Sequence, residues 1–319
     1  MSKSVLNAPH FHDEAAAYAW VEARVWPNGP VCPHCGGLER ISKMQGKSTR
    51  IGAYKCYQCR KPFTVKVGTI FESSHVEMKL WLQAMFLMSS SKKGVSSNQL
   101  HRTLGVTLKT AWFMSHRIRE AMRDGKLSPM GGSGGVVEAD ETYFGKVKAS
   151  KVRTVTTSGR PFTKGGRTGP SNKRAIISLV ERGGSVRSFH VENADKPTVV
   201  KIVSANVERE TRLHTDESRL YHGADTYFAQ HETINHSAKE YARGDVTTNS
   251  VEGYFSIFKR GMKGVYQHCS EKHLHRYLAE YDFRYNSRIA LGVNDLMRTE
   301  RAVRGIVGKR LTYQTTREG

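Results

Sequence analysis

Two pairs of cysteines near the N-terminus constrain the fold of this 319-residue chain more than any other feature. Cys32 and Cys35 form one CxxC pair, Cys56 and Cys59 form a second, and twenty residues separate the two pairs. Four thiolates held in two tight turns match the tetrahedral coordination that Zn²⁺ prefers. Unligated cysteines or a redox CxxC pair are the alternatives, but two matched pairs favour a closed zinc ribbon. Such a site contributes to folding and binding rather than to catalysis.

The charge balance indicates a polyanionic partner. The chain has 50 Lys and Arg residues against 29 Asp and Glu residues, which gives a net charge of +21. Because 38% of the residues are hydrophobic, a basic disordered tail is excluded. The apolar stretches are shorter than a membrane span and the N-terminus lacks the features of a secretory signal. We therefore expect a cytoplasmic protein that binds nucleic acid and does not contact a membrane.

The N-terminal half reads as a short helix and the zinc ribbon (residues 1–74), followed by three further helices (residues 75–129). The last two of these helices have the proportions of a helix-turn-helix, with Gly105 at the turn. In that arrangement, Lys109 and Arg117 of the final helix would face DNA. An ordinary three-helix packing unit is the alternative.

The glycine-rich segment 130–135 is the best candidate for a flexible linker. Beyond it, over residues 136–319, three β-branched strand patterns, a helix, a fourth strand and a largely helical remainder predict an α/β domain with a mixed sheet. Residues 145–174 contain nine Lys or Arg residues and no acid, which predicts a basic insertion. This insertion either clamps DNA phosphates or forms a disordered loop.

Three acidic residues are candidates for metal-dependent phosphodiester chemistry. Asp140 lies in the first predicted strand of the second domain, Asp216 at the end of a later strand, and Glu252 on a helix. Two-metal cleavage requires several carboxylates that converge from different elements. With 29 acidic residues in the chain, the local context of each candidate must decide.

The helix around Glu252 supplies that context. Val251, Tyr254, Phe255 and Phe258 form an apolar stripe at helical spacing. Glu252, Ser256, Lys259 and Lys263 recur on another face, so that one face can pack and the other can meet DNA. Thirty-five residues separate Asp216 from Glu252, and Lys259 follows the glutamate by seven positions.

This spacing resembles that of the DDE transposases, whose ribonuclease-H-like core carries two aspartates, a glutamate and a basic residue two helical turns later. The segment 235–286, together with ADETYFGK (139–146), HTDES (214–218) and GKRLTY (308–313), is similar to bacterial insertion-sequence transposases of the ISXO-like group. Members of that group also carry an N-terminal zinc ribbon, so the resemblance covers nearly the whole chain. It implies a nucleoid-associated bacterial protein that acts as a homo-oligomer on DNA.

The resemblance implies a role for each of these residues. Asp140, Asp216 and Glu252 would hold two Mg²⁺ or Mn²⁺ ions, and Lys259 would contact phosphate at the element's end. The chemistry would release a 3′-OH and then join it to target DNA. Arg260 and Lys263, on the same helix, are further candidates for DNA contact. Some members of the group carry Asn as the third ligand, and Asn249 stands three residues before Glu252, so both assignments stay open.

The expected fold is therefore a ribonuclease-H-like mixed α/β sheet, preceded by a small zinc ribbon and a helix-turn-helix-like segment. The expected function is that of a DNA transposase with structural Zn²⁺ and catalytic Mg²⁺ or Mn²⁺. A metal-dependent nuclease of the same fold and a zinc-ribbon DNA-binding regulator derived from a transposase are the alternatives. Divalent-metal dependence would distinguish an enzyme from a binder, and strand joining would distinguish a transposase from a nuclease.

Overall fold

A computed structural model describes residues 4–125, 127–146, 152–155, 158–159, 161–164 and 173–312. Most of the predicted basic insertion at 145–174 lies outside these residues. The chain divides into two compact units, one formed by Met1–Asp124 with Ser287–Gly319 and the other by Gly125–Asn286. In the described part of the chain, every helix is too short or too polar to cross a bilayer.

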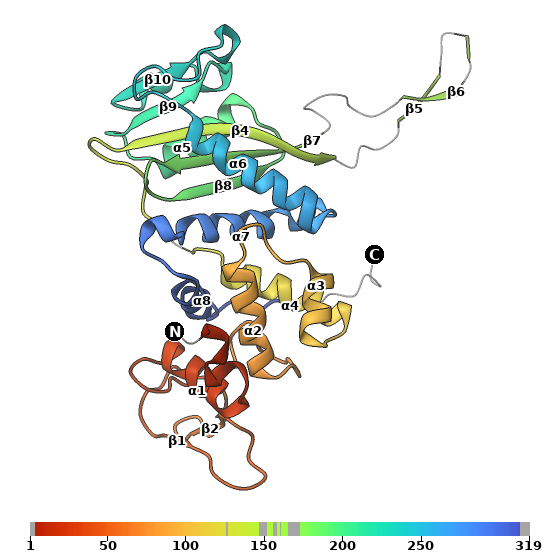
Figure 1. Ribbon diagram of the computed structural model, residues 1–319, viewed down its shortest axis with the longest axis vertical. Helices are drawn as coiled ribbons and strands as arrows, with labels where there is room; N and C mark the ends of the chain where they lie inside the picture. The colour runs from red at the N-terminus through yellow and green to blue at the C-terminus, as the bar shows by residue number, and fades with distance from the viewer. Residues whose placement is uncertain are drawn as a thin grey trace. The chain divides into compact units, whose positions relative to one another are not determined.

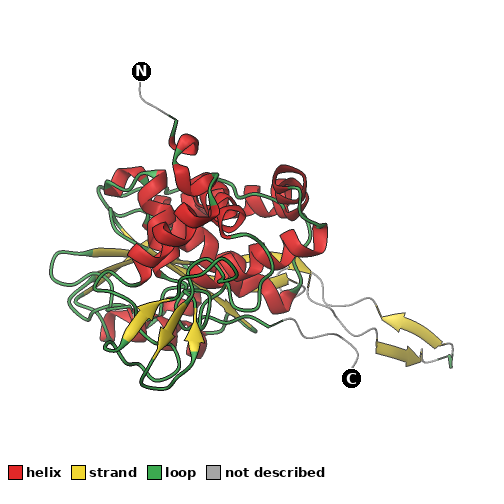
Figure 2. Cartoon of the chain, turned by 90° about the horizontal axis from the view of Figure 1, so that it is seen from below, coloured by secondary structure: helices red, strands yellow, loops and turns green. Residues whose placement is uncertain are grey.

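The first unit is mainly helical, and its strands belong to the ribbon (Figure 2). Its helices are α1 (Glu14–Val25), α2 (Met78–Ser90), α3 (Ser97–Leu104), α4 (Leu108–Ala121) and α8 (Asp295–Arg304). Its strands are β1 (Ile41–Lys43), β2 (Tyr54–Cys56) and β3 (Pro62–Phe63), which pair antiparallel in that order.

The start of α2 is fixed by a residue that is distant in sequence. Glu77, the residue before this helix, makes no side-chain cap hydrogen bond. Instead the carboxylate of Glu14, at the start of α1, accepts the backbone N–H groups of Met78 (2.7 Å) and Lys79 (3.0 Å). These bonds satisfy donors that the first turn of a helix leaves open, and they join α1 to α2.

Helices α3 and α4 are joined by a short turn at residues 105–107. The Ser96 side chain accepts the N–H of Gln99 to cap α3, and Thr107 accepts the N–H of Thr110 to cap α4. Between them Gly105 adopts a φ of 66°, a left-handed conformation in which glycine meets no steric penalty.

Helix α8 belongs to the first unit, whereas the sequence analysis placed residues 136–319 in the second domain. Helix α8 contacts α1, α2 and α4, and its Ala302 and Val303 are fully buried. The Arg298 guanidinium donates to the carbonyls of Ser89 and Ser287, both at 2.8 Å. An apolar stripe on a helix shows that a partner exists, but it does not identify which element provides it.

The second unit is built on a five-stranded sheet with the order β10-β9-β4-β7-β8 (Figure 1). Strand β7 is antiparallel to both β4 and β8, while β9 is parallel to β4 and β10 to β9. This order and these directions are those of the ribonuclease-H-like fold, which confirms the predicted fold class. The sheet consists of β4 (Val136–Lys146), β7 (Lys173–Glu181), β8 (Val186–Val191), β9 (Arg212–Asp216) and β10 (Gln230–Ile234).

The described part of this unit also contains α-helices, short 3-10 and π-helical turns, and a separate strand pair. The helices are α5 (Lys196–Asn206), α6 (Asn249–Gly261) and α7 (Leu274–Asn286), and the antiparallel pair is β5 (Val152–Val155) with β6 (Pro161–Lys164). Strand β10 lies where the sequence predicted helix. It is an edge strand in which only Ile234 is buried, so QHETI shows none of the apolar alternation that marks a strand.

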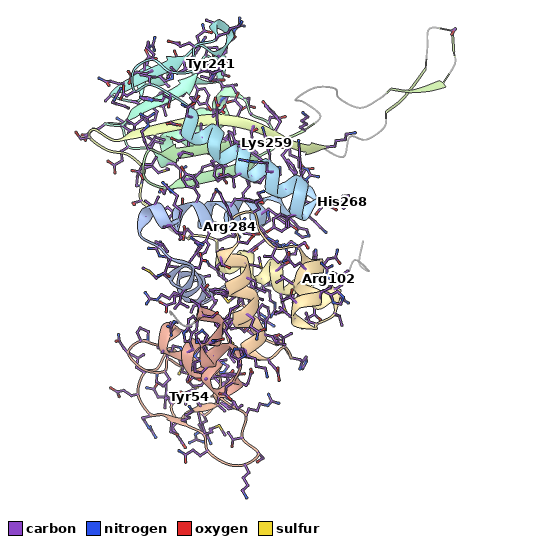
Figure 3. All side chains as sticks on the ribbon, viewed as in Figure 1. Tyr54, Arg102, Tyr241, Lys259, His268 and Arg284 are labelled. Carbon is purple, nitrogen blue, oxygen red and sulfur yellow. The ribbon has the colours of Figure 1, made fainter. Side chains whose placement is uncertain are left out.

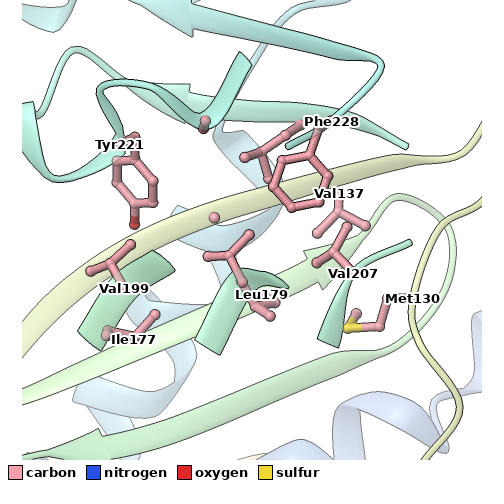
Figure 4. Packing of buried hydrophobic residues seen from close by; sticks show 12 residues of the cluster. Met130, Val137, Ile177, Leu179, Val199, Val207, Tyr221 and Phe228 are labelled. Atoms are coloured by element: carbon pink, nitrogen blue, oxygen red, sulfur yellow. The ribbon is translucent and has the colours of Figure 1, made fainter. Parts of the chain in front are cut away.

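The two faces of the sheet bury different residues of β4. Val137 and Ala139 pack with Leu179, Val199 and Tyr221 on the face covered by α5 (Figure 4). Because side chains alternate along a strand, Glu138 and Asp140 point to the opposite face, which α6 and α7 cover. The acidic residues of β4 therefore lie on the face that receives α6.

Candidate active site

The four cysteines of the ribbon form a site of the size that Zn²⁺ requires. Their Sγ atoms all lie within 4.8 Å of one another, with 3.6 Å between Cys32 and Cys59 and 3.8 Å between Cys35 and Cys56. Tetrahedral coordination with Zn–S bonds of about 2.3 Å separates sulfurs by about 3.8 Å. The prediction of a metal-binding cysteine cluster is therefore confirmed.

Backbone groups prepare this cluster for a cation. The N–H of Cys59 is the main cause that lowers the pKa of Cys56 to about 7, which favours the thiolate. Gly36, with a φ of 74°, completes the turn after the first pair, and its N–H donates to the carbonyl of Cys32 at 2.8 Å.

The sheet brings Asp140 and Asp216 together. In the parallel pairing of β4 with β9, Glu138 lies opposite His214. Two residues further along each strand stand Asp140 and Asp216, on the same face of the sheet. This placement depends on the register between two strands that are more than seventy residues apart in sequence.

Asp140 lies at the centre of a cluster of acids. Burial is the largest cause that raises its pKa to about 8, and the charges of Glu141, Asp216 and Glu252 raise it further. Burial likewise raises the pKa of Asp216. The charges of Asp216 and Glu252 therefore both act on Asp140.

Glu252 lies in the first turn of α6 and is half-exposed. Its Oε1 accepts the Thr248 hydroxyl at 3.2 Å and lies 3.3 Å from Nε2 of His236. The backbone N–H of His236 in turn donates to Glu217, next to Asp216, at 2.8 Å. These contacts connect the carboxyl end of β9 to the first turn of α6.

Lys259 follows on the same helix (Figure 3). Burial lowers the pKa of its amine, while the negative charge of Asp140 opposes that shift. Lys263 and Lys173 contribute further positive charge around Lys259. Arg260 and Lys263 are exposed, as contact with DNA requires.

The apolar stripe predicted for this helix is confirmed, since Val251, Tyr254, Phe255 and Phe258 are all buried in one cluster. Alternation along β4 places Glu138 on the same face of the sheet as Asp140. The structure shows it fully buried, with hydrogen bonds to Arg182 and to the start of α6. No local pattern in the sequence predicts the contact between Glu138 and Ser250, because the two residues are 112 positions apart.

Glu141 lies on the other side of β4. Its carboxylate accepts the Tyr221 hydroxyl at 3.1 Å and the Ser218 hydroxyl at 3.4 Å. Burial, and then the charge of Asp216, raise the pKa of Glu141. This residue therefore adds to the negative field around the two aspartates.

Arg117 is buried in the first unit, so it is not on the surface where the predicted contact with DNA would form. Its side chain is 5% exposed, and it donates to the carbonyls of Ile70 (2.7 Å), Glu72 (2.8 Å) and Leu311 (3.2 Å). The helical pattern of α4 made this face look cationic, but Arg117 bonds to the backbone of the first unit. Lys109, on the same helix, is exposed.

Because Arg117 is buried and Lys109 is exposed, we expect different effects from replacing them. Replacing Arg117 with methionine should lower the free energy of unfolding by about 2 to 4 kcal/mol, because buried carbonyls lose their donors. Lys109→Met, the control, should leave the melting temperature unchanged and weaken binding to duplex DNA. Calorimetry and DNA-binding isotherms measure the two effects. Weaker DNA binding by Arg117→Met at an unchanged melting temperature would restore the original assignment.

Comparison with known families identifies both units. Residues 133–286 match the model of the ISXO2-like transposase domain, and residues 12–62 match that of the transposase zinc-ribbon domain. The chain therefore contains an ISXO2-like transposase domain and a transposase zinc ribbon. The first match spans the whole sheet with α6 and α7, and the second contains all four cysteines, so this transposase has both expected parts.

A curated relative supports the assignment. The chain is 27% identical over 262 residues to an uncharacterized protein in transposable element ISH50 of Halobacterium salinarum, covering 81% of this chain and 86% of the relative. Among solved structures, a pre-cleavage Mos1 transpososome overlaps with a TM-score of 0.28 at 13% identity, over 70% of this chain and 73% of that one. A Mos1 mariner paired-end complex with Mn overlaps with a TM-score of 0.23 at 12% identity, over 65% and 76%. Both TM-scores are too low for these two structures to support a conclusion about the present chain.

Proposed function

We propose that this transposase cuts the ends of its own insertion sequence and joins the freed 3′-OH to target DNA. The observation that carries the proposal is the cluster of Asp140, Asp216 and Glu252, with Lys259 beside it. Asp140 and Asp216 share one face of the sheet, and Glu252 stands in the first turn of α6, the helix that packs against that face. Phosphodiester chemistry with divalent cations needs such a set of carboxylates.

The donor set fits Mg²⁺ or Mn²⁺. Carboxylate oxygens are the ligands that these hard cations prefer. Burial, and then the charges of neighbouring acids, raise the pKa of Asp140, and a bound cation would favour its carboxylate form. Asp140, Asp216 and Glu252 would hold the ions. Bound there, two divalent cations stabilise charge on the attacking and the leaving oxygen of the phosphodiester.

The surrounding residues of the chain orient this set and bind the substrate. His236 and Thr248 hold the Glu252 carboxylate through contacts of 3.3 and 3.2 Å. We assign Lys259 to a phosphate of the element's end, because its amine lies close to the acids and is partly removed from solvent. Arg260 on α6 and Lys263 in the π-helical turn that follows it, Met262–Tyr266, are exposed and extend the positive surface.

The partner in this proposal is DNA, both as element end and as target. The net charge of +21, the helix-turn-helix of α3 and α4 and the zinc ribbon support duplex binding by the rest of the chain. Because two ends must be processed together, we propose that the protein acts as a homo-oligomer.

The test is a joining assay with labelled duplexes carrying the terminal sequences of the element, a plasmid target and Mg²⁺ or Mn²⁺. Wild type should give metal-dependent joined product, and Glu252→Gln should lose it while still binding the ends. Cleavage without joining would make the protein a nuclease. Sequence-specific binding without metal-dependent chemistry would make it a DNA-binding regulator.

The same assay resolves the third ligand. Asn249 occupies the first position of α6 and is exposed, whereas the charge of Glu252 acts on Asp140. We therefore expect Asn249→Ser to retain joining. Full activity of Glu252→Gln together with loss in Asn249→Ser would assign the ligand to Asn249.

A further inference from the structure

The helix that carries Glu252 lacks a cap of its own. Thr248 occupies the N-cap position of α6, but its side chain makes no cap hydrogen bond. Its hydroxyl donates instead to Glu252 Oε1 at 3.2 Å. The backbone N–H groups of the first turn therefore need acceptors from elsewhere, since they have no partner within the helix.

Glu138 of β4 supplies those acceptors. Its Oε2 accepts the N–H of Ser250 at 2.7 Å and that of Val251 at 3.1 Å, and its Oε1 accepts the Ser250 hydroxyl at 3.0 Å. A carboxylate at this place also interacts favourably with the positive end of the helix dipole. The cap of α6 thus comes from the strand that also carries Asp140.

Arg182 completes this arrangement. Its guanidinium donates to Glu138 Oε1 at 2.8 Å and to the carbonyl of Asp245 at 2.7 Å, just before α6. Glu138 is fully buried, so an unpaired charge there would be costly. Both of its oxygens are already bonded within the protein, which sets it apart from Glu252.

We propose that Glu138 is the positioning residue of the active site: by capping α6 from β4, it sets the distance and angle at which Glu252 faces Asp140 and Asp216. Glu138 and Asp140 are two residues apart on one face of β4, and Ser250 and Glu252 are two residues apart on α6. The cap therefore locks the strand to the helix directly beside the acids. The inference rests on the proposed function, because it assigns Glu138 a role toward the metal-holding set.

The test uses electron paramagnetic resonance to measure Mn²⁺ binding to the full-length, zinc-loaded protein without DNA. Glu138→Gln keeps the shape of the side chain. It replaces the carboxylate, which accepts hydrogen bonds from Ser250, Val251 and Arg182, with an amide that carries no charge and has one acceptor oxygen. We expect the apparent dissociation constant for Mn²⁺ to rise by about tenfold or more, as found for partners that orient metal ligands. Binding to end DNA should change less than about twofold, and joining should be recovered in part at high Mn²⁺.

Glu280→Gln is the matched control. Glu280 is also a fully buried glutamate paired with an arginine, Arg284, but it lies on α7. If burial of an ion pair were all that mattered, both variants would melt earlier and neither would change the affinity for Mn²⁺. Ser250→Ala, which removes one hydroxyl and leaves both N–H bonds, should shift the Mn²⁺ affinity less than Glu138→Gln does.

The outcomes separate this inference from the proposed function. Asp140→Asn must abolish the tight Mn²⁺ binding of wild type; if it does not, the metal-holding set itself is wrong. If Asp140→Asn abolishes binding while Glu138→Gln binds Mn²⁺ like wild type, the positioning role is wrong and the proposed function stands. If Glu138→Gln fails to fold, Arg182→Lys provides the same measurement with a milder change.

Discussion

Replacing Asp140 with asparagine is expected to abolish strand joining, a loss of about a thousandfold or more, and at the same time to stabilise the metal-free protein. Activity falls because the substitution removes the carboxylate at the centre of the acidic cluster. Stability rises because the Asp140 carboxylate is buried beside other acids, whereas an asparagine side chain at the same place carries no charge. A residue kept for catalysis at the expense of stability should show both effects together.

The stabilisation should depend on pH. Burial raises the pKa of Asp140 from its ordinary value of 3.8 to about 8 in the folded protein, so between these values the folded state binds a proton that the unfolded state releases. The free energy of unfolding therefore decreases as the pH rises from about 4 to about 8. Asparagine removes this dependence, so the gain in melting temperature should grow with pH and level off above about 8.

Calorimetry on zinc-loaded protein without added Mg²⁺ or Mn²⁺, at pH 5, 7 and 9 (about two units apart), measures this trend. Asp225→Asn is the control, because Asp225 is an exposed aspartate in the same unit. It should leave both joining and the pH trend unchanged. A gain in melting temperature that is equal at all three pH values would contradict the assignment of Asp140 as the buried acid.

The second large effect concerns the zinc ribbon. Cys56→Ser should eliminate stoichiometric zinc and unfold the ribbon, because structural zinc contributes about 10 to 16 kcal/mol to folding such modules. The apolar cluster there consists mainly of Phe63 and the cysteines, with Trp26, Ile41 and Tyr54 partly buried against it. So small a core does not offset the loss of the metal.

Zinc release measured with a chromogenic chelator and hydrogen exchange over β1, β2 and β3 test this expectation. Cys269→Ser is the matched control, since Cys269 lies in the second unit and should keep the zinc content unchanged. End-DNA binding should fall in Cys56→Ser and remain in Cys269→Ser. Retention of full zinc by Cys56→Ser would show that three cysteines suffice.

The parts of the site with a local signal could be predicted from the sequence. The paired cysteines and the two faces of α6 each lie within one short segment, so spacing and periodicity describe them. Asp140 and Asp216 were identified through context, but their adjacency follows from strand register, which appears only once β4 pairs with β9.

The parts that depend on tertiary contacts could not be predicted. Strand β10 takes its conformation from pairing with β9, since its own residues are mostly polar. Arg117 has the helical spacing of a surface cation, yet carbonyls distant in sequence enclose its guanidinium. In both cases the neighbour, rather than the residue type, decides the outcome.

The caps supplied by Glu14 to α2 and by Glu138 to α6 affect how the chain folds. Both helices lack a cap hydrogen bond from their own N-cap residue and depend on carboxylates 64 and 112 residues away. Such helices gain their first turn only after long loops have closed, and contacts of this range slow folding. For α6 the consequence is that Glu252 reaches its place late, once β4 is in position. We therefore expect a partly folded chain to hold Glu252 apart from Asp140 and Asp216 until α6 has packed against β4.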